Sequence, residues 1–126
     1  MPQPPRSVRY KLGCELDYEV RSPSTFFFNV EVARLQRHGD LEERLTLSPG
    51  VPSRSYVRPD TNNRYLGVTV PPGPFHLSYE AEVTLDVHRA DPATIGETPL
   101  AEMPLDIMPF LLPSRYVPSD RLAAFA

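Results

Sequence analysis

The sequence has a single cysteine, a single lysine, three histidines and no tryptophan. One cysteine excludes an internal disulfide and any metal site built from several thiolates. No apolar run approaches the roughly 18 residues that a membrane-spanning helix needs, and the first residues lack the apolar segment of a secretory signal. We therefore expect a cytoplasmic protein with no membrane partner.

Positive charge is also sparse. Thirteen basic residues are scattered among sixteen acidic ones, which gives a net charge of -3. No cluster of lysine and arginine could follow a phosphate backbone, so we expect no nucleic-acid partner. Three histidines without ligand spacing do not indicate a metal site, and we expect no cofactor.

Proline is abundant, with sixteen residues in a chain of 126. Each proline removes a backbone donor and clashes with the preceding helical turn, so long helices are excluded. Between the prolines lie short segments with apolar residues at every second position, which is typical of half-buried strands. The clearest are residues 10–20 and 75–88, and four weaker candidates are residues 25–32, 41–47, 53–58 and 65–70.

These strands predict an all-β fold, an immunoglobulin-like antiparallel β-sandwich of six to eight strands with an extended proline-rich C-terminal strap. We expect a flexible N-terminus over 1–8, the sandwich over 9–89, and a strap with an inter-domain junction over 90–118. Residues 119–126 indicate the start of a helix that the sequence cuts short, with Ser119 as its N-cap. Phe26 to Phe28 place aromatic rings on both faces of their strand, which predicts cover on both sides.

The candidate nucleophile is Cys14, but its position in the alternation turns the thiol toward the core, where thiols are unreactive. His76 and His88 fall on the face of their strand opposite to its apolar residues, roughly 40 Å apart, so they cannot share a metal. His38 precedes a turn glycine and is expected to be solvated. The pattern predicts no catalytic site and no metal site.

Glu80 and Glu82 lie two apart on one strand face, roughly 6–7 Å from each other, a separation that would suit a glycosidase carboxylate pair. The competing interpretation is an ordinary solvent-facing strand that carries charge for solubility. No aromatic platform and no nucleophile-elbow motif accompany the pair. We favour the solvent-facing interpretation.

Several segments resemble bacterial transglutaminase-like proteins, in which a β-sandwich precedes a papain-like cysteine protease domain. The resemblance is carried by PFLLPSRYVPSDRL at 109–122, GCELDY at 13–18, PSTF at 23–26 and FNV at 28–30. It covers residues 9–125. It implies a non-catalytic N-terminal accessory domain that packs against a downstream catalytic domain with a Cys-His-Asp site for acyl transfer or amide hydrolysis. None of that site maps here: Cys14 matches no catalytic motif, and Val117 stands where relatives often carry a cysteine that is not the nucleophile.

Under this resemblance the segment from Ile107 to Tyr116 is the candidate contact with the catalytic domain, because large exposed apolar patches mark interaction sites. The alternative is that its side chains complete the sandwich core. Two other functions stay open: a free-standing immunoglobulin-like module that binds protein or glycan, and a small β-sandwich hydrolase. The substrate of a catalytic domain and the oligomeric state are not predicted. The candidate interface residues are Phe110, Leu111, Leu112, Arg115 and Tyr116.

Overall fold

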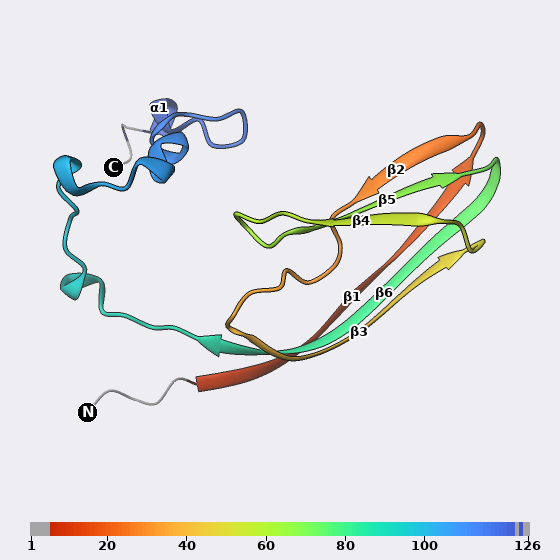
Figure 1. Cartoon of the computed structure of the whole chain (residues 1–126), viewed down its shortest axis with the longest axis horizontal. Helices are drawn as coiled ribbons and strands as arrows, with labels where there is room; N and C mark the ends of the chain where they lie inside the picture. Colours follow the sequence, from red (N-terminus) through yellow and green to blue (C-terminus); the bar gives the residue numbers. More distant parts are fainter. Residues whose placement is uncertain (1–5, 123, 125–126) are drawn as a thin grey trace. The chain divides into compact units, whose positions relative to one another are not determined.

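The computed structural model describes residues 6–122 and 124. The chain divides into two units, residues 1–89 and 90–126. The first unit contains two three-stranded sheets in which all neighbouring strands are antiparallel (Figure 1). One sheet has the order β1-β6-β3, formed by β1 (Arg6–Val20), β6 (Gly73–Val87) and β3 (His38–Ser48). The other has the order β2-β5-β4, formed by β2 (Ser24–Phe28), β5 (Arg64–Val70) and β4 (Ser53–Val57).

The prediction of an all-β sandwich is confirmed. The core lies between the sheets, where alternate residues of β6 and β5 meet. Phe75, Leu77 and Tyr79 are each at most 1% exposed. Aromatic rings close one end of the core, with Phe26 stacked on Phe28 at 5.7 Å between centroids. The remaining buried side chains are Val20, Leu66, Val68, Val70, Ala81 and Val83.

The two sheets differ in length. β1 and β6 pair without interruption over fifteen residues each, whereas β2 and β4 have five. The long strands therefore extend past the shorter sheet (Figure 1). Apolar side chains on β1 that alternation places on the inner face are consequently left half-exposed, with Tyr10 at 45% and Leu12 at 39%.

Some details of the strand predictions were wrong. Phe27 is 75% exposed, because only one face of β2 has a partner sheet. The second strand ends at Phe28 rather than at residue 32. Residues 6–8, expected in a flexible N-terminus, begin β1, while residues 1–5 lie outside the described residues. The expected turn at 38–40 is instead the start of β3. The register with β6 shifts there between Gly39 and Glu42, in a bulge that contains Asp40 at a φ of 47°.

The described residues of the second unit form three short 3-10 helices, which the proline spacing did not predict, and one short α-helix. They are η1 (Pro92–Thr94), η2 (Leu100–Glu102), η3 (Leu105–Leu111) and α1 (Ser119–Leu122). Asp91 caps η1 through its side chain, and Pro109 lies inside η3. Ser119, the expected N-cap, is the first residue of α1; residues 123, 125 and 126 of the expected helix lie outside the described residues. No helix in the described part of the chain is long and apolar enough to span a membrane.

Candidate functional site

The predicted interface residues all lie in the second unit, on η3 and the turn that follows it. Phe110 is 84% exposed and Tyr116 is 89% exposed, and Leu112 is exposed as well. The turn is closed by the backbone amide of Ser114, which donates to the carbonyl of Val117 at 3.0 Å. Leu111 and Arg115 are also exposed.

None of the described side chains of residues 90–126 is buried. Only Met103, Ile107 and Pro118 are partly covered. The core of the sandwich, in contrast, is formed by side chains from residues 14–81. Phe110 and Tyr116 are thus not among the residues that form this core. Exposed apolar groups of this size are typical of a contact surface.

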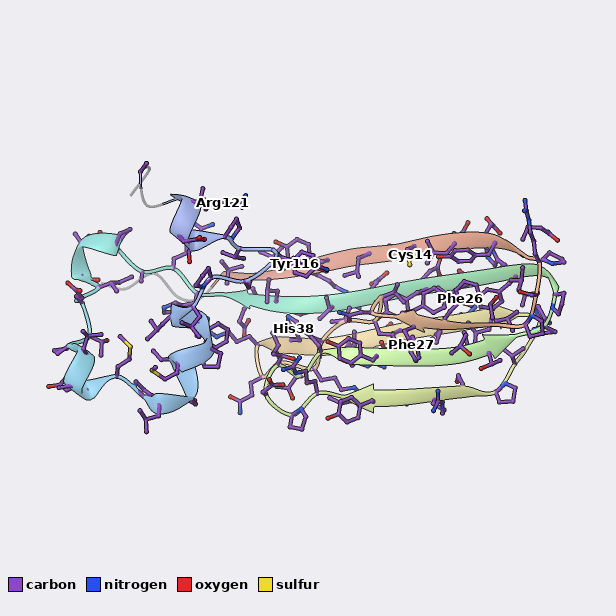
Figure 2. The ribbon with its side chains drawn as sticks, turned by 90° about the horizontal axis from the view of Figure 1, so that it is seen from above. Cys14, Phe26, Phe27, His38, Tyr116 and Arg121 are labelled. Carbon is purple, nitrogen blue, oxygen red and sulfur yellow. The ribbon has the colours of Figure 1, made fainter. Side chains whose placement is uncertain are left out.

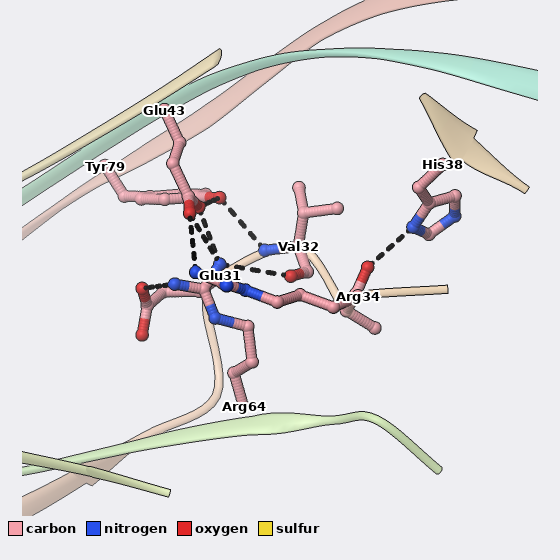
Figure 3. Close-up of polar contacts among 8 residues, drawn as sticks. Glu31, Val32, Arg34, His38, Glu43, Arg64 and Tyr79 are labelled. Atoms are coloured by element: carbon pink, nitrogen blue, oxygen red, sulfur yellow. Dashed lines mark hydrogen bonds and ion pairs between the residues drawn. The ribbon is translucent and has the colours of Figure 1, made fainter. Parts of the chain in front are cut away.

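A second notable feature is an ion cluster inside the sandwich, where Arg64 at the start of β5 reaches the opposite sheet (Figure 3). Its guanidinium donates to both carboxylate oxygens of Glu43 on β3, at 2.9 and 2.7 Å, and to Glu31 at 2.5 Å. The Tyr79 hydroxyl donates to Glu43 at 2.8 Å and accepts from the Val32 amide at 3.0 Å. Among the described residues no buried side-chain polar atom is left without a partner.

The cluster is largely shielded from water. The side chains of Arg64 and Glu31 are 11% and 9% exposed, and that of Glu43 is 21% exposed. Burial alone would raise the pKa of Glu43, but hydrogen bonds from Arg64 and Tyr79 outweigh it and hold this pKa below its ordinary value. Burial, together with the adjacent carboxylate, raises the pKa of Tyr79 to about 12. The guanidinium of Arg64 bridges the two carboxylates, so the cluster ties β3, β5 and the segment after β2 together.

The sequence contains a signal for this cluster that the predictions above did not include. Leu41, Leu45 and Leu47 pack against the core from β3. Glu43 interrupts that apolar series and lies opposite Ala81 of β6. A carboxylate in an apolar stripe requires a buried partner, and that requirement indicates an ion pair.

The structure separates the residues that a thiol enzyme would need to bring together. Cys14 is partly buried and packs against the core, as the alternation predicted. His38 lies well away from it along the sheet, as Figure 2 shows. The Nδ1 atom of His38 is 2.6 Å from the carbonyl oxygen of Ala33, and the residue is half-buried, so it is less solvated than expected. His88 is exposed, and His76 pairs with Asp17 at 2.7 Å.

Glu80 and Glu82 also occupy the outer face of their sheet. Glu80 is exposed, and Glu82 forms an ion pair with Arg9 at 3.0 Å. A pair in which one carboxylate is neutralised by an arginine on an open sheet face favours the solvent-facing interpretation. Within the described residues, no group of three or more histidine, cysteine or carboxylate side chains is arranged to hold a metal ion.

A shallow open hollow of about 650 Å³ lies at the end of the sandwich where β1 ends and β6 begins. Its walls include Pro71, Pro72 and Pro74, and the pair His76 and Asp17 lies at its edge. The prolines give it a rigid apolar side, and the ion pair gives it one polar side. No cysteine is among its described lining residues.

Comparisons with known proteins agree on one family. The family described as "Bacterial transglutaminase, N-terminal domain" matches residues 8–106. A crystal structure described as a "putative cysteine protease" from Cytophaga hutchinsonii is 28% identical to this chain, with a TM-score of 0.78. That alignment covers 95% of this chain and 42% of the other, so this chain spans less than half of that protein. No curated protein matches. Because the family match extends over most of the chain, this protein belongs to the family of bacterial transglutaminase N-terminal domains.

Proposed function

We propose that this chain is a non-catalytic accessory domain that packs against the catalytic domain of a transglutaminase-like cysteine protease or acyltransferase. The downstream domain would supply the Cys-His-Asp site, and this chain would buttress it and help shape access to its cleft. Membership of the N-terminal family supports the assignment, and so does the share of the related protease that this chain matches.

The proposed location of the contact surface rests on the exposure of the apolar side chains between Ile107 and Tyr116. Phe110, Leu112 and Tyr116 are 84%, 67% and 89% exposed, and no described side chain of their unit is buried. Fully burying one such side chain contributes about 1.5–3 kcal/mol. Covering several of them against a neighbouring domain would therefore stabilise both the segment and the contact.

The first test is to read the coding sequence beyond Ala126. An accessory domain requires a downstream segment with a cysteine followed later by a histidine and an aspartate. A stop codon at that point would instead favour a free-standing module that binds protein or glycan.

The second test measures the contact itself. This chain and the downstream domain are produced separately and titrated by calorimetry. Replacing Phe110 and Tyr116 together by serine should weaken binding by about a hundredfold, because roughly 3 kcal/mol of apolar burial is lost. Leu100→Ser is the matched control, since Leu100 is 82% exposed but lies outside the segment. Equal effects of the two variants, or no binding of the unaltered chain, would contradict the proposal.

A further inference from the structure

β1 is a long regular edge strand. It forms one side of the β1-β6-β3 sheet and pairs with β6 through fifteen consecutive residues without a bulge. Its sequence contains no proline. The side of β1 away from β6 therefore offers a row of backbone donors and acceptors that another strand can pair with.

The other three edge strands are interrupted or short. β3 carries a bulge between Gly39 and Glu42. β2 and β4 have five residues each, with Pro23 just before β2 and Pro52 just before β4. These are the features by which sheet edges are protected from pairing with another chain. β1 also follows a proline, Pro5, and carries Lys11, but among the described edge strands it combines full length with unbroken pairing.

Charge is distributed along β1 in two halves. On the outer face the N-terminal half carries Arg9 and Lys11, and the C-terminal half carries Glu15, Asp17 and Glu19. Arg9 already contacts Glu82 of β6, and Asp17 contacts His76. Lys11, Glu15 and Glu19 form no ion pair with the other described residues.

We propose that two copies of this chain associate through their β1 strands, paired antiparallel about a two-fold axis at Gly13. In this register Lys11 faces Glu15 of the second copy and Arg9 faces its Asp17, and symmetry repeats both pairs. A parallel arrangement would instead place like charges side by side. The β1-β6-β3 sheets of the two copies would then form one continuous six-stranded sheet.

The inner face of β1 fits the same arrangement. Tyr10, Leu12 and Tyr18 are 45%, 39% and 38% exposed, although alternation places them on the core side. In the proposed register Tyr10 lies opposite Leu16 of the second copy, and Leu12 lies opposite its Cys14. Gly13 meets Gly13 at the axis, so no side chain obstructs the approach of the two backbones. The inference uses residues of β1 alone and does not depend on the proposed accessory function.

Sedimentation of the whole 126-residue chain at low salt, from roughly 1 to 200 μM, tests the proposal. We expect a reversible dimer that weakens as salt is added, because exposed charge pairs are screened. Lys11→Glu should raise the dissociation constant roughly tenfold or more, since two attractive pairs become repulsive. The double variant Lys11→Glu with Glu15→Lys should restore it, because the pairs are re-formed with exchanged signs.

Arg54→Glu is the matched control, because it makes the same change in net charge on an exposed position of β4. It should leave the dissociation constant unchanged, and circular dichroism should show the same strand content in every variant. A monomer at every concentration would overturn the proposal. So would a dimer insensitive to Lys11→Glu, or one that the double variant fails to restore.

Discussion

Replacing Arg64 by methionine is expected to destabilise the sandwich more than removal of any exposed charge. Methionine keeps much of the side-chain volume but removes the guanidinium that lies closest to the carboxylates of Glu31 and Glu43, and leaves Glu43 with Arg34 at 3.8 Å. Removing one partner of a fully buried ion pair costs about 3–5 kcal/mol. Glu43 retains the Tyr79 hydroxyl and is 21% exposed, so we expect a loss of about 3 kcal/mol.

A loss of that size should be easy to measure. A domain of this length is stable by only about 5–15 kcal/mol, and each kcal/mol lowers the melting temperature by about 4–8 °C. Urea unfolding at pH 7 should therefore show a much lower midpoint. Arg58→Met is the matched control, since Arg58 pairs with Asp60 on the surface and its loss should produce no measurable change.

The pH dependence separates this mechanism from a simple packing defect. The pKa of Glu43 is below its ordinary value of 4.5 in the folded protein, so its contribution is present above that pH and is lost as the pH falls through the folded value. Without Arg64 the strongest influence that lowers the pKa of Glu43 is gone, so this pKa rises relative to the unaltered protein, and protonation on acidification relieves the charge that lost its nearest cation. The difference in stability between the unaltered protein and Arg64→Met should therefore shrink between pH 7 and about pH 4. An equal difference at both pH values would refute the reasoning.

Three further changes follow from the same structure. Tyr79→Phe should cost about 1–2 kcal/mol in urea unfolding, because the Val32 amide and Glu43 both lose a partner; an unchanged midpoint would contradict this. Gly13→Ala should lower stability by about 1–3 kcal/mol, because the new Cβ would lie 2.5 Å from the Tyr79 carbonyl oxygen; a neutral effect would show that the strand shifts freely. Leu77→Ala should cost about 2–5 kcal/mol and Phe27→Ala much less, since Leu77 is 0% exposed and Phe27 is 75% exposed; equal losses would place both in the core.

Much of the sandwich could be predicted from the sequence because its strands alternate with few exceptions. In β6 every second residue from Phe75 to Val83 is buried, so period two identified both the strand and its buried face. The same rule failed at Phe27, because alternation does not say whether the second face of a strand has a neighbour. The turn expected at His38 and Gly39 was also wrong, because both residues pair with β6, and pairing with a strand distant in the sequence is not visible in a local turn signal.

The ion cluster shows a second limit. Glu43 and Arg64 are twenty-one residues apart and lie on different sheets, so no spacing rule connects them. An acidic residue within an apolar alternation indicates that a partner is needed, but it does not indicate which of thirteen basic residues provides it. Only the packing of one sheet on the other brings Arg64 to that point.

The two units also differ in what holds them together. The sandwich buries the rings and branched side chains of four strands in its own core, which can offset the conformational entropy of roughly 1–2 kcal/mol per residue that folding removes. Residues 90–126 bury no described side chain and contain 3-10 helices whose hydrogen bonds have poorer geometry. Burial within this unit therefore offsets little of the entropy lost in ordering it. Contact with a further surface through side chains such as Phe110 and Tyr116 would supply the missing burial, which is the physical basis for placing the domain contact there.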